Sequence, residues 1–436
     1  MASTGSFATK VDASNNTTLN RKLYSVALFA QTQKAPGFAR TLTGDAPSSA
    51  DAMNKMRGQT SAGMPIVRVT DLSKTQGGSV SVDMFGTIAG KAIYGDADAE
   101  GSGVALTSAS MDIAINNVTK VVDVGGRMAA QRTVHELRNV AMANLTSYFA
   151  RYDDQTSLVH LAGARGDEVN SDWVVPLDTD ADANNGFAVT MINTVKAPTR
   201  NRHFTISTSG LAVGGDRVVS GIATTDLFKL VHLDALRLNL DEAAFSLQSV
   251  KIADDPAAAD EPMWVLYLSP RQYSTLLQES TANNNIRAFQ QNAWNRASYG
   301  SKHPLFKGEV GMWNGILVKK LNRAIRFSSA NANYKYVTAA NKATETETTA
   351  AIHGNITAAY AIDRAILLGA QALGNCYGKA KSSDYHFGWL ENEYNMGRNL
   401  ELGGEVMGGK AKLRFKLSGE DPTDQGVICV DSVVAV

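Results

Sequence analysis

Three patterns in the sequence predict an α+β fold. Apolar and polar residues alternate over residues 78–124, with the period of two that is typical of strands. Apolar residues then recur every three or four positions from Val134 to Val159, which is the period of an amphipathic helix. Further on, WVLYL at 264–268 is a continuous apolar run, typical of a strand that is covered on both faces.

The first part of the chain predicts an arm followed by a projecting hairpin. Residues 1–64 are rich in Ser, Thr, Ala, Asn and Gly, which suits an arm better than a packed domain. Two alternating runs, around Val82 and around Ile113, are separated by the flexible, acidic residues 89–103. We expect a hairpin with strands of roughly 30 Å. Because a lone hairpin cannot bury its apolar face, it needs a partner surface in the same or a neighbouring chain.

The next element is predicted to be a long helix that acts as a beam. About 30 residues would give a length of roughly 45 Å. Gly163 and Gly166 supply the expected end, because glycine readily adopts the left-handed conformation found after helices. The residues predicted to face the core are Val134, Leu137, Ala141, Leu145, Phe149, Tyr152, Thr156 and Val159.

The rest of the chain predicts a mixed body. Thr225 is the expected N-cap of a leucine-rich helix that continues to Leu247, and Ser269 with Pro270 begins another helix. Residues 329–351 are a low-complexity stretch, for which we expect an exposed loop. Further strands are expected at 203–206, 316–318, 366–368, 411–417 and 427–434.

Composition excludes several classes of protein. The 436 residues include 42 basic and 42 acidic ones, which argues against a broad basic face for nucleic acid or an anionic membrane. Cys376 and Cys429 are the two cysteines and are far apart, so we expect buried structural thiols rather than a disulfide scaffold. No apolar run approaches the 18 or so residues that span a bilayer, so we expect no membrane partner.

Motifs for catalysis and metal binding do not emerge from the sequence. Walker, GxSxG and HExxH patterns are missing, and the seven histidines have no metal-ligand spacing. Asp178, Asp180 and Asp182 resemble the start of a calcium loop, but Ala183 and Val189 stand where that loop needs glycine and glutamate. An acidic surface loop is the better interpretation.

Two other groups of charged residues give only weak evidence of a functional site. Glu391, Glu393 and Glu401 cannot be placed as a glycosidase pair from sequence alone. The basic pairs at 200–202 and 319–320 are short and lack interleaved aromatic residues. We therefore predict no catalytic, cofactor-binding or metal-binding residue.

Several phrases, in order, resemble the major capsid protein of tailed bacteriophages, which has the Hong Kong 97 fold, in its N-four-like podophage branch. They extend from about residue 63 to the C-terminus, whereas residues 1–60 and 329–351 contain no matching phrase. The phrases are GMPIVRVTDLSK (63–74), VVDVGGRMAAQRTV (121–134), LVHLAGAR (158–165), KAPTRNRH (196–203), HPLF (303–306), GMWNG (311–315), RAILLGAQAL (364–373) and GGKAKLRF (408–415).

This resemblance implies a division of the chain. Residues 1–68 would be an N-terminal arm and 69–125 an extended β-hairpin loop that lies across a neighbouring subunit. Residues 126–204 and 385–436 would form a peripheral domain with the long helix as its spine. Residues 205–384 would form an axial α/β domain. Some members of the fold cross-link a lysine to an asparagine, but no motif here assigns that role to Lys91.

The resemblance also implies a function. The chain would be a coat protein, not an enzyme, that self-assembles into the icosahedral head of a double-stranded DNA phage. Its partners would be copies of itself in pentamers and hexamers, a portal, scaffolding or decoration proteins, and DNA bound without sequence specificity. It would assemble in the host bacterial cytoplasm and reside in the virion, without cofactors.

Two alternatives remain open at this point. The same fold could form a bacterial nanocompartment that encloses an enzyme, which neighbouring genes for a cargo enzyme would favour. The chain could also be a cytoplasmic enzyme whose site the sequence does not reveal. A pocket with perturbed titratable groups would support that interpretation.

Overall fold

The computed structural model describes the chain in segments. The described residues are 38–43, 63–69, 78–85, 92–94, 100, 103, 107–126, 131–132, 136–169, 172–243, 246–250, 262–279, 309–380, 386–394, 396, 398–417 and 420–436. The apolar stretch at 23–30, the hairpin tip around Lys91, His135 and the HPLF phrase at 303–306 lie outside the described residues.

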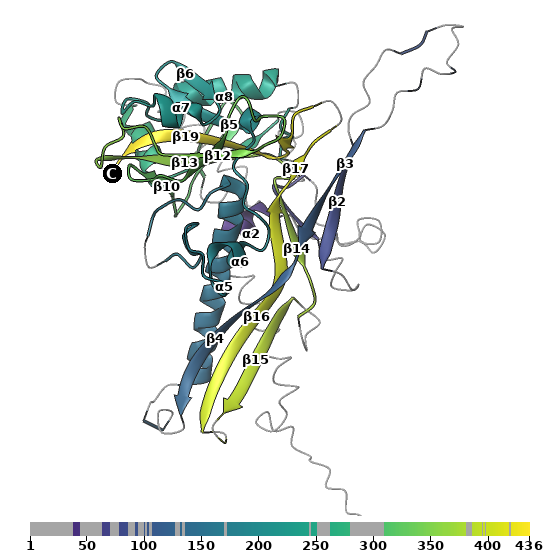
Figure 1. The fold of residues 1–436 in the computed structure, drawn as a ribbon, viewed down its shortest axis with the longest axis vertical. Helices are drawn as coiled ribbons and strands as arrows, with labels where there is room; N and C mark the ends of the chain where they lie inside the picture. The colour runs from purple at the N-terminus through teal and green to yellow at the C-terminus, as the bar shows by residue number, and fades with distance from the viewer. Residues whose placement is uncertain are drawn as a thin grey trace, which may run out of the picture.

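The largest element is an eight-stranded mixed sheet, seen at the top of Figure 1. Its order is β6-β5-β19-β13-β7-β9-β8, and β10 also pairs with β13. The strands are β5 (His203–Ser207), β6 (Gly210–Val213), β7 (Trp264–Leu268), β8 (Glu309–Trp313), β9 (Ile316–Lys320), β10 (Ile325–Ser328), β13 (Tyr360–Leu368) and β19 (Val427–Ala435).

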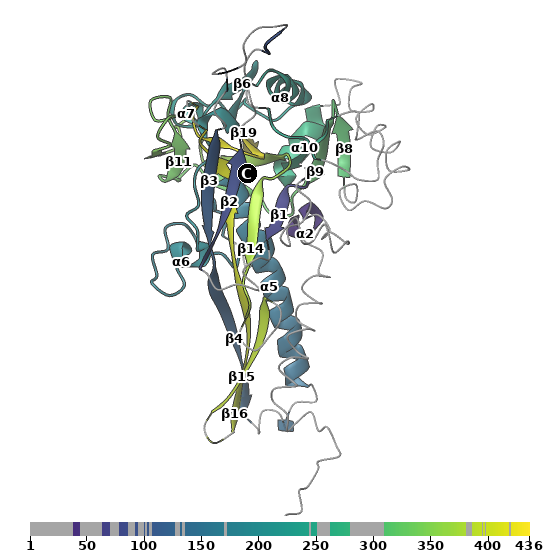
Figure 2. The ribbon, with the colours of Figure 1, turned by 90° about the vertical axis from the view of Figure 1, so that its right-hand side faces the viewer.

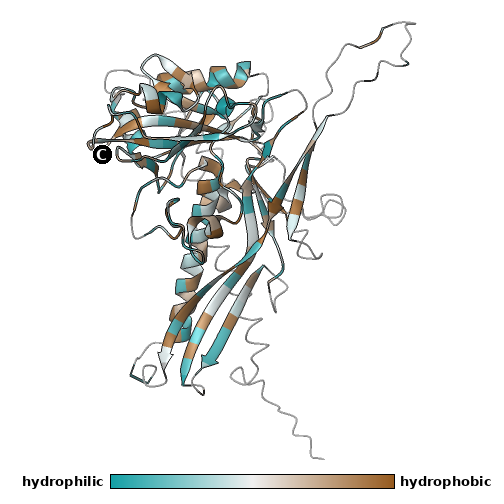
Figure 3. Cartoon of the chain, in the orientation of Figure 1, coloured by the Kyte–Doolittle hydropathy of each residue, from teal (hydrophilic) through white to brown (hydrophobic). Residues whose placement is uncertain are grey.

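Both faces of this sheet are covered, as the apolar strand at 264–268 predicts. Trp264, Leu266 and Leu268 point to one face, where helices α8 (Leu230–Glu242) and α10 (Pro270–Glu279) pack. Val265 and Tyr267 point to the other face, toward the end of helix α5 (Leu137–Ala162). The strand is therefore fully buried, and hydrophobic residues gather along it and its neighbours (Figure 3).

Helix α5 extends from this sheet along a second, five-stranded sheet (Figures 1 and 2). Its 26 residues correspond to about 39 Å, and Gly163 ends it with φ 68°. Aromatic side chains join helix and sheet, with Phe149 packed edge-on against Phe387 at 5.9 Å between ring centroids. The strands are β1 (Ile66–Val69), β4 (Asn116–Gly126), β14 (Leu373–Tyr377), β15 (Phe387–Tyr394) and β16 (Asn399–Lys412).

The predicted hairpin is present as strands β2 (Ser79–Phe85) and β3 (Ser108–Ala114). They pair antiparallel, with Val82 opposite Met111, and form a two-stranded ribbon that projects from the body (Figure 1). Its apolar face, which includes Val80, Val82 and Met84, packs on Leu413 and Phe415. Directly after β3, the chain continues as β4 and pairs with β16, so residues 116–126 belong to the five-stranded sheet.

Several smaller elements complete the described fold. Two short sheets join β11 (Tyr334–Val337) to β12 (Glu347–Ala350) and β17 (Arg414–Phe415) to β18 (Thr423–Asp424). The short helices are α2 (Phe38–Leu42), α6 (Phe187–Met191), η2 (Arg200–Arg202) and α7 (Asp216–Ser220).

One local prediction from the sequence is confirmed, and two are wrong. Ser269 and Pro270 do begin helix α10, and the Gln272 amide donates to Ser269 Oγ at 3.1 Å, as an N-cap requires. The Thr225 cap is wrong, because α8 begins after Lys229 and ends at Glu242. The exposed loop at 329–351 is also wrong, since it contains the β11–β12 hairpin and its Tyr334 is completely buried.

Two strands were predicted near the C-terminus, and the structure divides the first and confirms the second. The strand expected at 411–417 divides between the end of β16 and the two-residue β17. The strand at 427–434 is confirmed as β19, but it lies between β5 and β13 in the eight-stranded sheet. The strands of the predicted block 385–436 therefore belong to three sheets.

Candidate functional site

The most concentrated polar group in the described structure is a buried network of His203, Tyr334, Arg364 and Asp431, here called the central network. Arg364 binds Asp431 with two parallel contacts, Nε to Oδ1 at 2.7 Å and Nη2 to Oδ2 at 2.8 Å. His203 Nε2 lies 2.8 Å from Asp431 Oδ2, and the Tyr334 hydroxyl donates to the same oxygen. None of these residues has any exposed surface.

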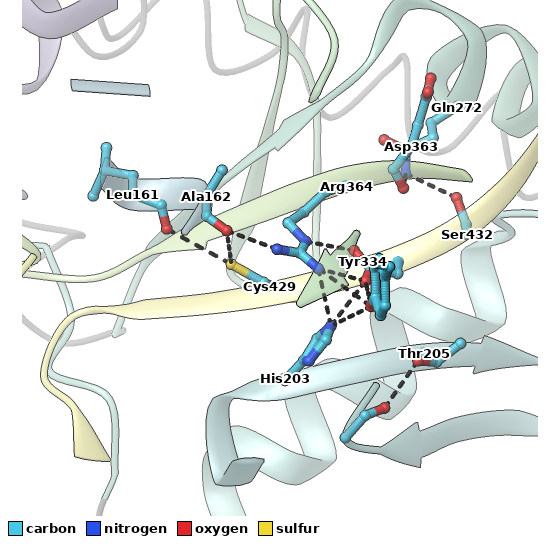
Figure 4. A network of polar contacts seen from close by, with 12 residues as sticks. Leu161, Ala162, His203, Thr205, Gln272, Tyr334, Asp363, Arg364, Cys429 and Ser432 are labelled. Carbon is cyan, nitrogen blue, oxygen red and sulfur yellow. Dashed lines mark hydrogen bonds and ion pairs between the residues drawn. The ribbon is translucent and has the colours of Figure 1, made fainter. Parts of the chain in front are cut away.

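The central network fastens the end of helix α5 to the sheet. Arg364 Nη1 donates to the carbonyl oxygen of Ala162 at 2.9 Å, one of the helix-end carbonyls without a partner inside the helix (Figure 4). Cys429 Sγ lies 3.7 Å from the carbonyl oxygens of Leu161 and Ala162. Strands β5, β11, β13 and β19 thus meet one helix end.

Electrostatics give the network a fixed charge state. Burial alone would raise the pKa of Asp431, but Arg364 and His203 outweigh it and hold that pKa well below its usual range. Burial lowers the pKa of His203 despite the adjacent Asp431, which keeps the imidazole neutral. A buried group of this kind serves structure, although His203 Nδ1 has no hydrogen-bond partner among the described residues.

A second group of polar contacts holds α5 to the five-stranded sheet. Lys410 of β16 lies with Nζ 2.6 Å from Asp153 Oδ1, and it also donates to the hydroxyls of Thr156 and Ser157 at 2.9 and 2.8 Å. A cavity of about 40 Å³ adjoins this contact and is also lined by Asn375. That volume holds two or three water molecules at most.

A third cluster connects the β11–β12 hairpin to the end of the chain. Arg414 binds Asp424 at 2.8 Å and Glu345 at 2.5 Å, and Lys412 lies 2.9 Å from Asp424. Burial raises the pKa of Glu345 to about 7, with Arg414 opposing the shift. The Glu345 carboxylate is thus paired with the guanidinium of Arg414.

The acidic loop that the sequence analysis considered for calcium is a capped turn. Asp182 Oδ1 accepts the amides of Asn184 and Asn185 at 2.7 and 3.2 Å, and Asp180 and Asp182 are exposed. The prediction of an acidic surface loop is confirmed. Among the described residues, no three His, Cys, Asp or Glu side chains come together as a metal site would require.

The glutamates considered for hydrolysis do not face one another. Glu391 pairs with Arg138 at 3.3 Å and accepts the indole N–H of Trp389 at 2.8 Å. Glu401 lies opposite Asn392, so it points to the other face of the sheet from Glu391 and Glu393. Glu393 is exposed, whereas 13% of the Glu391 side chain is exposed.

The basic pairs and the thiols also have structural places. Arg202 and Lys319 are buried, so neither pair forms a continuous basic patch. Cys376 and Cys429 are buried and unlinked, as the sequence predicts. Of the other histidines, burial lowers the pKa of His160 and of His386 to about 3.

The central network was not predicted from the sequence. A signal was present in the charged residues inside apolar strands, Asp363 and Arg364 within β13 and Asp431 within β19. A charge in such a position needs a buried partner. Only the pairing of β13 with β19 and of β19 with β5 identifies those partners.

One carboxylate outside these groups gives a pH prediction. Burial raises the pKa of Asp154, on α5, to about 6 from its ordinary 3.8. The folded state therefore holds this proton more tightly than the unfolded chain, and the associated stability is present below pH 4 and lost as pH rises to 6. Relative to Asp154→Asn, we expect the unfolding free energy of the unchanged protein to fall by about 2 kcal/mol over this range.

Urea unfolding of both proteins at several pH values measures this difference. A constant difference between pH 4 and pH 7 would contradict the assignment. Asp234→Asn, on the exposed surface of α8, is the control substitution.

The described structure combines a two-stranded ribbon, a long helix along a five-stranded sheet, and an eight-stranded mixed sheet. Among the described residues, no helix is both long and apolar enough to cross a membrane. Residues 13–436 match the family described as phage capsid protein. The chain belongs to the phage capsid protein family and is a bacteriophage coat protein.

Solved structures agree with this fold. The capsid protein of Ralstonia phage GP4 superposes with a TM-score of 0.67 at 22% identity, covering 86% of this chain and 88% of that one. The cyanophage Pam1 capsid gives 0.56 at 16% identity, covering 86% and 89%. The head of Helicobacter pylori bacteriophage KHP40 gives 0.52 at 11%, covering 85% and 88%. No curated protein matches the chain.

Proposed function

We propose that many copies of this coat protein self-assemble, as pentamers and hexamers, into the icosahedral head of a tailed phage that packages double-stranded DNA. The projecting β2–β3 ribbon carries this proposal. Among the described strands, it pairs with no third one, and Phe85 at its outer end is 62% exposed. A two-stranded ribbon is marginal by itself. Its apolar face packs on Leu413 and Phe415 of the same chain, and we expect a second copy to cover the opposite face, which carries Phe85.

We also propose that different segments of the chain form a peripheral domain, an axial domain and an arm. Residues 126–204, with α5 as the spine, and the strands of 385–412 suit a peripheral domain. Residues 205–384 suit an axial domain around the capsomer centre. The position of β19 in the same sheet as β13 favours adding residues 427–435 to the axial domain. The arm is best limited to residues before Phe38, because α2 packs in the core.

The remaining partners follow from the same proposal. A closed head needs a portal for DNA entry, and scaffolding or decoration proteins are further candidate partners. The equal numbers of basic and acidic residues suit DNA enclosed without sequence-specific contacts. We expect assembly in the host bacterial cytoplasm and no enzymatic activity. Membership of the N-four-like podophage branch stays a prediction.

Substitution of Phe85 tests the role of the ribbon. Phe85→Ser removes a ring that is 62% exposed in the subunit, so we expect little change in the melting temperature. Assembly should fall, because the exposed part of the ring is available to a neighbour. Sedimentation velocity and negative-stain electron microscopy of the co-expressed protein measure the fraction in particles.

Val213→Ser is the matched control, since Val213 is 50% exposed on β6 of the sheet. Equal assembly of both variants would contradict the role given to the ribbon. A chain that stays monomeric when portal and scaffolding proteins are supplied would contradict the proposed function itself. Particles that enclose a host enzyme and no DNA would favour the nanocompartment instead.

A further inference from the structure

Helix α2 is an isolated short helix that depends on its packing. A helix of five residues cannot hold its shape alone, because too few hydrogen bonds offset the ordering of its backbone. Its stability must come from burial, and Ala39 and Leu42 are 3% and 0% exposed. We call Phe38–Thr43 the latch segment.

The latch segment contacts helix α5 through a carboxylate. Asp154 Oδ1 accepts the amide of Ala39 at 3.0 Å, and the Phe38 amide also bonds to this side chain. Amides in the first turn of a helix have no partner within it, so a carboxylate at this place caps the helix. The charged groups that act on Asp154 are Asp153 on its own helix and Lys410 from β16.

The same segment contacts the eight-stranded sheet from its other side. The Phe38 ring lies edge-on to the Tyr267 ring of β7, with 4.7 Å between centroids and 73° between planes. Leu42 belongs to the apolar cluster that also contains Leu158 of α5 and Leu317 of β9. The latch segment therefore fills the corner between the helix and the sheet.

The connections of this segment permit it to move as a unit. Thr43 forms an isolated bridge with Ile66, whereas β1 is paired along four residues with β14. The hydroxyls of Thr41 and Thr43 bond to Phe38 and Ala39 within the segment itself. Among the described residues, its attachment consists of the Asp154 cap, one bridge, a contact between the Thr41 and Tyr267 side chains, and apolar contacts. These contacts can open without breaking either large sheet.

We propose that Phe38–Thr43 is a detachable latch that docks between α5 and β7, and that its release loosens the joint between the helix and the eight-stranded sheet. The ligand of this docking site is a segment of the same chain. The latch goes beyond the coat function. It would determine how far the angle between α5 and the eight-stranded sheet can change within one subunit. The Arg364 contact to Ala162 remains as the second tie at this joint.

Hydrogen exchange of the unassembled full-length protein tests the latch. Phe38→Ala removes the contact to Tyr267, and Asp154→Ala removes the cap on α2. Each should speed exchange of the amides at 39–42 and of the last turn of α5 by roughly tenfold or more. Amides paired between β13 and β19 should keep their rates, because the sheet stays closed.

Tyr394→Ala, which truncates a partly exposed ring on β15, is the control and should change neither region. Unchanged exchange in the last turn of α5, with faster exchange at 39–42, would overturn the coupling. Exchange at 39–42 that matches the β13–β19 rate in the unchanged protein would show opening only by global unfolding and would overturn the latch. Both readouts concern the subunit alone, so they are independent of shell assembly.

Discussion

Asp431→Asn should lower the unfolding free energy of the subunit by about 3–5 kcal/mol. The substitution removes the charge that offsets Arg364 and keeps nearly the same volume. Arg364 would then remain fully buried without a counter-charge, while its contact to Ala162 holds it in place. Urea unfolding of the unassembled protein, followed by circular dichroism, measures the loss.

Two comparisons make this expectation specific. The double variant Arg364→Met, Asp431→Leu should recover a large part of the loss, because no unpaired charge remains in the core. Lys342→Met breaks an exposed pair with Asp421 at 3.0 Å, and should change stability by less than about 1 kcal/mol. An Asp431→Asn variant as stable as the Lys342→Met variant would show that the central network is not a structural tie.

Gly409→Ala should displace the root of the projecting ribbon. A Cβ on Gly409 would lie 1.9 Å from the carbonyl oxygen of Ala114, where β3 becomes β4. Asn193 holds the same peptide, accepting the Ala114 amide and donating to its carbonyl at 3.0 Å each. Because backbone must move away from backbone, we expect a loss of about 1–3 kcal/mol and a larger relative loss of assembly.

Gly403→Ala is the matched control on the same strand. Its Cβ would meet Leu390 at 3.4 Å, an ordinary contact, so stability should change by less than about 0.5 kcal/mol. Thermal unfolding and particle counts by electron microscopy compare the two variants. Normal particles from Gly409→Ala would show that the ribbon tolerates a shifted root.

Elements with a strong local pattern could be predicted from the sequence. The period of two around Val82 and Ile113 predicts the β2–β3 pairing, and the period of α5 with Gly163 predicts its extent to within a few residues. Ser269 with Pro270 also marks a helix start without help from the rest of the fold. In each case, neighbouring residues carry the whole signal.

Elements that depend on distant residues could not be predicted. The stretch 329–351 has the composition of a loop, yet Tyr334 folds it onto the sheet by reaching His203 and Asp431. Thr225 has a suitable side chain for a cap, but α8 begins at Leu230, and His232 Nδ1 accepts the backbone amide of the N-cap residue Lys229. The contacts of Asp431 in the central network join residues at least 67 positions apart, beyond any local pattern.

The place of β19 has a consequence for synthesis on the ribosome. Residues 427–435 occupy an inner position between β5 and β13, although they are translated after both of those strands. The sheet therefore stays open, with Arg364 lacking Asp431, until translation has passed residue 435. Chains that stop before β19 lack an inner strand and a buried counter-charge, so this topology distinguishes them from chains that contain β19 before they meet other copies.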